Sequence, residues 1–221
     1  LYPLMTSSGC PFQCIYCAAR NRRWYPRSAK NCVEELEQAK KRFRIVSFEV
    51  LDDAFNVDKK RVLEFCRLVG PLKLRWVCAN GLRADRLDEE MARAMAEAGC
   101  TDVSFGIESV DNQVLRNVQK GETIEQIEKG VTIAKKYFKR VNGFFIIGLP
   151  GSSYKRDLES VEWMIKKRIT GVFSYYVPFD KQLEYDDMFY GAEAKAQSDE
   201  YPKDKQETIY QMTAFMRQET N

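Results

Sequence analysis

The sequence has no histidine and no long apolar run, and each absence excludes a class of function. Without histidine, the chain cannot form a histidine-containing catalytic triad or supply an imidazole metal ligand. No apolar stretch approaches the roughly 20 residues of a membrane-spanning helix, so we expect no membrane partner. The excess of positive charge is also small, because 35 Lys and Arg face 32 Asp and Glu for a net charge of +3. A nucleic-acid partner is therefore not favoured.

The cysteines argue against a disulfide framework. Their number, seven, is odd, and residues 1–10 show no basic region before their short apolar stretch, so we expect no secretory signal there. A reducing cytoplasm is the predicted compartment. The chain also begins without Met, which fits a piece of a longer protein. Cys66, Cys78 and Cys100 are expected in the core, where a free thiol packs as a small apolar group.

Short β-rich apolar runs alternate with helix-patterned stretches along the chain. Six such alternations predict a parallel sheet with right-handed crossovers. A full eight-unit barrel takes about 250 residues, so 221 residues leave room for six units. We therefore predict an α/β fold that forms a partial (β/α)6 TIM-like barrel, in preference to an open doubly wound sheet.

The periodicity also predicts the element boundaries and two regions. Residues 1–178 are expected to form the core, and 179–221 a short C-terminal appendage that is mostly helical, with a helix near 204–219. The predicted strands are 2–7, 45–50, 73–78, 102–107, 140–147 and 171–177, and the predicted helices are 29–43, 57–69, 88–98, 123–137 and 153–168.

Cys10, Cys14 and Cys17 are spaced Cys-x3-Cys-x2-Cys directly after the first predicted strand. In a barrel this loop lies at the C-terminal mouth, where catalytic residues gather. Three thiolates can ligate three irons of a [4Fe–4S] cluster and leave the fourth iron open to a small molecule. The alternatives are three unrelated cysteines or a zinc site, which needs a fourth ligand; Cys32 is a lone and distant candidate.

This segment, with an aromatic residue before the third cysteine, resembles the signature of the radical S-adenosylmethionine (radical SAM) superfamily. The resemblance extends over about residues 1–178. It includes the pair Asp52-Asp53, Arg83-Ala-Asp85, the segment GCTDVSFGIES at 99–109 and the segment GFFIIGLPG at 143–151. It implies an enzyme with a [4Fe–4S] cluster and S-adenosyl-L-methionine (SAM) as cofactors. The reduced cluster would cleave SAM and produce a 5′-deoxyadenosyl radical that abstracts a hydrogen atom from substrate.

The resemblance also implies roles for single residues. Cys10, Cys14 and Cys17 are the implied cluster ligands, and Tyr16 would lie along the adenine of SAM. Asp52 or Asp53 would accept hydrogen bonds from the SAM amine. The alternative is that one of these carboxylates only caps the turn into the next helix.

Arg83 would bind the SAM carboxylate through a bidentate guanidinium contact, although it can instead pair with Asp85 or Asp88 at the surface. Further along the chain, Glu108 and Ser109 would bind the ribose or the methionyl part of SAM.

Ile147 and Gly148 would let the adenine approach the backbone closely. The alternative for the sequence that follows them, Pro150-Gly151, is a simple turn.

Within the superfamily, these motifs most resemble cobalamin-associated enzymes, many of which are methyltransferases. Any cobalamin-binding region would precede residue 1. The expected Pro-Gly-Thr run after Tyr-Val-Pro-Phe is replaced by a segment that begins at Asp180. The alternatives are a cobalamin-free radical SAM isomerase, dehydratase or methylthiotransferase and, more remotely, a zinc-stabilised binding module. The substrate, a small molecule or a peptide, is not identified.

A basic stretch follows the cysteine segment and therefore belongs near the mouth of the barrel. It is either a solvated loop or a surface for an anionic partner, which would be an anionic substrate or an acidic reductant such as a flavodoxin or ferredoxin. Its residues are Arg20, Arg22, Arg23, Arg27 and Lys30, with Trp24 and Tyr25 between them.

Overall fold

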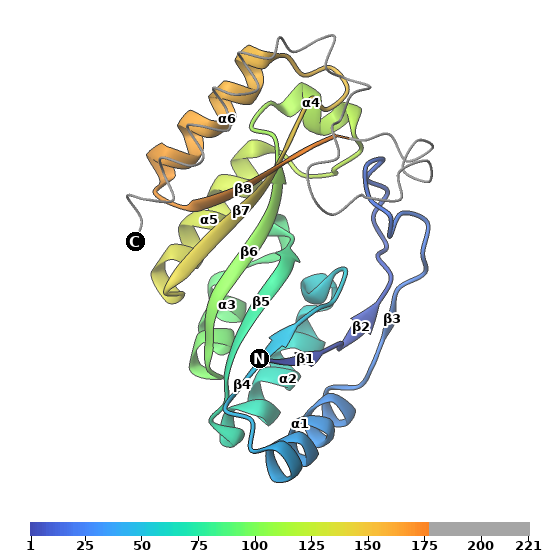
Figure 1. Cartoon of the computed structure of the whole chain (residues 1–221), viewed down its shortest axis with the longest axis vertical. Coiled ribbons are helices and arrows are strands. Elements are labelled where there is room, and N and C mark those ends of the chain that lie inside the picture. Colours follow the sequence, from blue (N-terminus) through green and yellow to red (C-terminus); the bar gives the residue numbers. More distant parts are fainter. Residues whose placement is uncertain (177–221) are drawn as a thin grey trace. The chain divides into compact units, whose positions relative to one another are not determined.

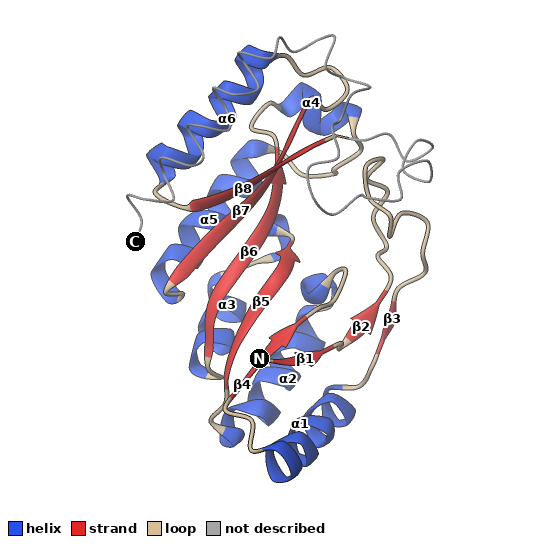
Figure 2. Ribbon diagram, viewed as in Figure 1, coloured by secondary structure: helices blue, strands red, loops and turns tan. Residues whose placement is uncertain are grey.

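The computed structural model describes residues 1–176. Six strands form one sheet in the order β1-β4-β5-β6-β7-β8, which is also their order along the chain. The pairs β1–β4, β4–β5 and β5–β6 are parallel, and a helix follows each strand except the last (Figure 2). The partial (β/α)6 arrangement is confirmed. The predicted appendage at 179–221 and the departure at Asp180 lie outside the described residues.

The observed elements match the predicted ones closely, with ends that differ by a few residues (Figure 1). The sheet strands are β1 (Tyr2–Leu4), β4 (Ser47–Val50), β5 (Arg75–Leu82), β6 (Cys100–Glu108), β7 (Arg140–Ile147) and β8 (Thr170–Tyr175). The helices are α1 (Ala29–Phe43), α2 (Lys59–Val69), α3 (Glu89–Glu97), α4 (Asn112–Asn117), α5 (Ile124–Tyr137) and α6 (Tyr154–Lys167), with short 3-10 turns η1 (Phe55–Val57), η2 (Gly70–Leu72) and η3 (Ala84–Arg86).

The starts of α2 and α3 are each fixed by an aspartate side chain that lies next to the helix in the sequence. The side chain of Asp58 accepts a hydrogen bond from the Arg61 N–H at the start of α2, and Asp88 accepts one from Met91 at the start of α3. Each carboxylate satisfies a backbone donor that the first turn leaves unpaired. At the other end of α3, Gly99 adopts φ +97, a left-handed conformation that glycine adopts without steric cost.

Three features are absent from the predicted pattern. Two short strands, β2 (Ser7–Ser8) and β3 (Tyr25–Pro26), pair antiparallel, and the short helix α4 follows β6. Strand β5 continues to Leu82, so Cys78 lies within the strand, whereas the sequence predicted that the strand ends there. Two-residue strands have too few positions to show a periodicity, which explains why they escape prediction.

The described chain divides into two compact units. Of the described residues, the first unit contains 1–11, 21–106 and 125–142, and the second contains 12–20, 107–124 and 143–176. The core of the first unit is built on aromatic rings: Phe48 stacks on Trp76 with centroids 5.6 Å apart, and Phe65 meets Trp76 edge-on at 5.8 Å. Such pairs stabilise a core beyond the area that they bury.

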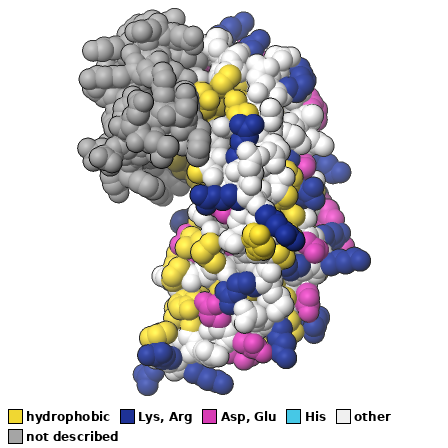
Figure 3. Space-filling model, turned by 90° about the vertical axis from the view of Figure 1, so that its right-hand side faces the viewer, with side chains coloured by type: hydrophobic (Ala, Val, Ile, Leu, Met, Phe, Trp, Pro, Cys, Tyr) yellow, Lys and Arg dark blue, Asp and Glu magenta, His cyan; other side chains and the backbone are white. Residues whose placement is uncertain are grey.

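The predicted buried cysteines Cys66, Cys78 and Cys100 all lie in the core of the first unit. On the face shown in Figure 3, acidic and basic side chains are interspersed over the described residues, as the small net charge leads one to expect. None of the described helices is both long enough and apolar enough to cross a membrane.

Candidate cofactor site

In the first unit, Asp52 is a buried carboxylate with a full set of donors. It follows β4, and its oxygens accept hydrogen bonds from the Thr6 N–H at 2.6 Å, the Thr6 hydroxyl at 2.5 Å and the Ser7 hydroxyl at 2.6 Å. The guanidinium of Arg61 lies 4.0 Å away. Because Thr6 and Ser7 belong to the segment that leads into the cysteine loop, Asp52 holds that segment against the end of β4.

Asp53 differs from its neighbour because it is exposed. One of its carboxylate oxygens accepts a hydrogen bond from the Gly9 N–H at 2.9 Å, next to Cys10. Of the two candidates for the SAM amine, Asp53 is therefore the one that an external ligand can reach, and Asp52 is the one that shapes the loop.

Arg83 forms the internal pair that was the alternative to a SAM contact. It follows β5, is 8% exposed, and its guanidinium contacts both carboxylate oxygens of Asp85, at 2.9 and 3.3 Å. Its backbone is held from both sides by Asn56, whose amide accepts from the Arg83 N–H at 3.0 Å and donates to the Arg83 carbonyl at 2.8 Å.

In the second unit, Cys14 and Cys17 lie on a loop whose backbone is locally ordered. The Cys17 N–H donates to the Cys14 carbonyl at 3.2 Å, and the Ala19 N–H points at the Cys17 sulfur at 3.4 Å. Backbone N–H groups directed at cysteine sulfurs stabilise thiolate ligands and tune the potential of the clusters that they hold. The Ile15 N–H donates a hydrogen bond to the Val118 carbonyl at 3.1 Å, which links the loop to the turn after α4.

Tyr16 turns inward from this loop and packs with Ile15 against the buried side chains of Val114, Val118 and Leu149. Burial first, and then the charge of Glu108 and of Cys14, raise the pKa of the Tyr16 phenol well above its ordinary value. The phenol therefore keeps its proton throughout the physiological range.

Glu108 ends β6 in a left-handed conformation, with φ +67. A non-glycine residue in this region is strained and persists only where its surroundings hold it. Its carboxylate is 3.2 Å from the Lys120 ammonium, which also lies 3.4 Å from the carboxylate of Glu122. All three side chains are at most 8% exposed.

Lys120 and Glu122 were missed by the sequence reasoning, since no periodicity marks a buried ion pair in a loop. Lys120 also contacts the cysteine loop, because its carbonyl oxygen lies 4.0 Å from the Cys14 sulfur. One residue thus contacts a predicted cluster ligand through its backbone and a predicted SAM-binding residue through its side chain.

Ser109 and Gly148 occupy neighbouring strand ends of the same unit. Ser109 is buried, and its hydroxyl accepts from the Asp111 N–H at 3.2 Å. Gly148 follows the buried Ile147, has φ +76, and donates its N–H to Asp157 at 3.0 Å. Asp157, which the sequence reasoning also missed, is a buried acceptor that fixes the turn after β7.

The thiols suit an iron–sulfur cluster chemically, since all seven cysteines are free of disulfides and thiolates are the usual protein ligands of such clusters. Within residues 1–176, no group of three or more His, Cys, Asp or Glu side chains is gathered as metal ligands. Cys10 belongs to the first unit, and Cys14 and Cys17 to the second. The three-thiol centre is therefore a prediction from the sequence.

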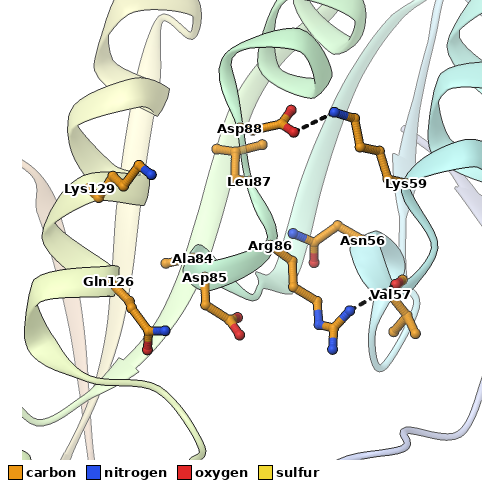
Figure 4. Close-up of a pocket in the computed structure, with 10 residues that line it drawn as sticks. All are labelled: Asn56, Val57, Lys59, Ala84, Asp85, Arg86, Leu87, Asp88, Gln126 and Lys129. Carbon is orange, nitrogen blue, oxygen red and sulfur yellow. Dashed lines mark hydrogen bonds and ion pairs between the residues drawn. The ribbon is translucent and has the colours of Figure 1, made fainter.

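A cavity of about 420 Å³ lies apart from these residues, within the first unit (Figure 4). Its wall includes Lys59, which reaches Asp88 at 2.5 Å, and Arg86, which donates to the Val57 carbonyl at 3.2 Å. Gln126 and Lys129 from α5 face it from the other side. None of the predicted SAM-binding residues lines this cavity.

Comparison with known proteins identifies the family. A model of the radical SAM superfamily matches residues 4–164, which is most of the chain. This chain therefore belongs to the radical SAM superfamily, whose members use a [4Fe–4S] cluster and SAM.

The chain is similar to two methyltransferases. It is 36% identical to an uncharacterized methyltransferase of Pyrococcus horikoshii, over 74% of this chain and 36% of that protein. It is 31% identical to cytidylyl-2-hydroxyethylphosphonate methyltransferase of Streptomyces wedmorensis, over 66% of this chain and 28% of that protein. The chain thus spans about a third of the length of these relatives.

The fold is similar to that of the radical SAM methyltransferase TsrM from Kitasatospora setae, solved with cobalamin and a [4Fe–4S] cluster bound. The TM-score is 0.72 and the identity 21%, over 82% of this chain and 39% of that chain. This likeness confirms the predicted barrel-like fold.

Proposed function

We propose that this chain is the SAM-cleaving core of a radical SAM transferase that modifies its substrate by methyl transfer. Family membership supports the SAM chemistry, and similarity to proteins named as methyltransferases supports the transfer. The observation that carries the proposal is the contact between the cysteine loop and the end of β6. There, the partly buried Tyr16 lies near Glu108, and Lys120 contacts both Cys14 and Glu108.

In this proposal, Cys10, Cys14 and Cys17 ligate the cluster through three of its irons. When bound and reduced, the cluster and SAM together supply the 5′-deoxyadenosyl radical chemistry. The protein positions these groups and excludes water. The Ala19 N–H stabilises the negative charge on the Cys17 sulfur.

The other predicted residues hold SAM. Asp53 accepts hydrogen bonds from the amine, because it is exposed while Asp52 is fully engaged by Thr6 and Ser7. Tyr16 lies along the adenine.

The remaining contacts to SAM come from three strand ends. Glu108 and Ser109 bind the ribose or the methionyl part, and Ile147 and Gly148 offer the backbone to the adenine. Arg83 binds the SAM carboxylate only if it exchanges its bidentate contact with Asp85 for the ligand.

Cobalamin is the proposed methyl carrier, bound by a region outside this chain. The similarity in fold to TsrM, whose structure contains cobalamin, supports this part of the proposal. A low-potential reductant such as a flavodoxin or ferredoxin is the proposed electron source, and a small molecule or peptide the proposed substrate. Because the thiols must stay reduced, we place the protein in the cytoplasm.

The proposal is tested by anaerobic reconstitution with iron and sulfide, reduction with dithionite, addition of SAM and measurement of 5′-deoxyadenosine. Wild type should assemble a cluster and release 5′-deoxyadenosine, while Cys14→Ala should lose both. Cys32→Ala is the matched control, because Cys32 is a buried free thiol on α1 and its loss should leave the cluster intact. Stoichiometric zinc without iron would support the binding-module alternative.

Methyl transfer needs a separate experiment with the longest form of the protein that contains this chain. Transfer of a labelled methyl group from SAM to any acceptor should depend on added cobalamin. SAM cleavage that is independent of cobalamin, with no labelled product, would instead favour the isomerase or dehydratase alternatives. A labelled product that forms without cobalamin would favour the methylthiotransferase alternative.

A further inference from the structure

The basic stretch after the cysteine segment is not uniform in the structure. Arg27 contacts Glu35 at 2.6 Å, and Lys30 lies 3.9 Å from Glu34, so both cations are paired within the chain. Arg22 and Arg23 are different: both are exposed, and neither forms an ion pair with any described residue.

Arg22, Arg23, Trp24 and Tyr25, here called the arginine ribbon, lie directly against the loop that carries Cys10. Strand β3 begins at Tyr25, which is paired antiparallel with Ser8. One step further, the Cys10 N–H donates to the Arg22 carbonyl at 3.2 Å.

Gly9 confirms how close the two backbones are. A β-carbon on Gly9 would lie 2.2 Å from the Arg23 carbonyl oxygen, and the residue has φ +75. Only glycine fits there. The backbone of the arginine ribbon thus touches the residue that precedes a predicted cluster ligand.

The ribbon presents a combination that is typical of protein-binding surfaces. Tyr25 is 57% exposed, and the Arg23 guanidinium lies 5.3 Å from the centre of its ring. Arginine and tyrosine are enriched at protein interfaces, and clustered positive charge steers acidic partners into contact. An arginine that is held over an aromatic ring and not neutralised by an acid keeps its charge available to a partner.

We propose that the arginine ribbon is the docking surface for an acidic protein that carries one electron to the cluster. This inference rests on the proposed function, because it takes Cys10 as a cluster ligand. The carrier is oxidised by one electron and the cluster is reduced by one, so no bond forms and no proton moves. The rate of electron transfer falls steeply with distance. A docking surface whose backbone contacts Gly9 and Cys10 would bring the carrier close to the cluster.

The test uses reconstituted protein and purified flavodoxin, an acidic flavoprotein, as the probe. Its reduced form is mixed with oxidised protein at low salt, and two quantities are measured: the dissociation constant of the complex and the rate of cluster reduction. We expect R22E/R23E to weaken binding and slow reduction by about tenfold or more. R22K/R23K, which keeps the charge, should stay near wild type. The wild-type rate should fall as salt rises, since exposed charges are screened.

Two controls separate the possible outcomes. K41E/R67E reverses two exposed cations on α1 and α2 and should leave the flavodoxin rate unchanged. Reduction by dithionite should be equal in all variants, and a thermal melt of each should match wild type. Equal flavodoxin rates in wild type and R22E/R23E at low salt would overturn the docking surface. If neither wild type nor any variant assembles a cluster, the proposed function is overturned instead.

Discussion

The ammonium of Lys120 lies 3.2 Å from the carboxylate of Glu108, and the two side chains are 7% and 8% exposed. A buried ion pair of this kind contributes little net stability relative to apolar packing, but breaking it leaves an uncompensated charge. Loss of the Lys120 ammonium would leave two buried carboxylates without their positive partner, because Glu122 shares the same ammonium.

Lys120→Met should therefore lower the free energy of unfolding by about 3–5 kcal/mol, measured by urea denaturation. Lys120→Arg, which keeps the charge, should lose less. Lys129→Met is the matched control, because Lys129 is exposed on α5 and its replacement should change stability by less than about 0.5 kcal/mol. If Lys120→Met unfolds like wild type, the pair has no structural role.

Substitutions of the adjacent Asp52 and Asp53 should have different effects, one on stability and the other on SAM binding. Asp52→Asn removes a charged acceptor from Thr6 and Ser7 and should cost about 2–3 kcal/mol of stability. Asp53→Asn, at an exposed position, should change stability by less than about 1 kcal/mol and weaken SAM binding by about tenfold. Thermal melts and equilibrium SAM binding to reconstituted protein measure the two effects. The reverse pattern would assign the SAM contact to Asp52.

Asp157 should matter for stability although it is not a predicted ligand. Asp157→Ala leaves the Gly148 N–H and the Ser152 hydroxyl without their acceptor, which should cost about 1–3 kcal/mol. Glu159→Ala, an exposed change on the same helix, is the control for lost helix charge. Equal denaturation midpoints for the two variants would contradict this role.

Stability should fall at alkaline pH. Burial raises the pKa of Cys66 from the ordinary value of 9.0 to about 12. The folded state therefore keeps this proton when the unfolded state has lost it. Below the unfolded pKa this stabilisation is fully present, and it is lost as pH rises from 9.0 toward 12, at about 1.4 kcal/mol per pH unit for one thiol.

Urea denaturation at about pH 8 and about pH 11 measures the loss. Cys66→Ala removes this thiol and should make the decline shallower. The decline should not vanish, because burial also raises the pKa of Cys78 and of Tyr16. An unchanged slope in Cys66→Ala would show that Cys66 does not contribute.

Local sequence patterns were sufficient for the elements of the fold. Alternation of period 2 and period 3.6 predicted all six sheet strands and five helices. These features depend on residues only a few positions apart, so their pattern is visible in the sequence. The cysteine spacing identified the superfamily for the same reason.

Only the tertiary structure decided how individual polar residues are used. Asp52 and Asp53 are equivalent in the sequence, but only Asp52 is buried by donors that lie 45 and 46 positions away. Lys120 resembles any loop lysine until its pairing with Glu108, 12 positions away, is seen. Such contacts are set by how strands and loops pack, and a one-dimensional pattern carries no signal for them. The sequence by itself thus determined the fold class and the cofactor chemistry to expect, while packing decided which carboxylates, amines and arginines remain available to a ligand or partner.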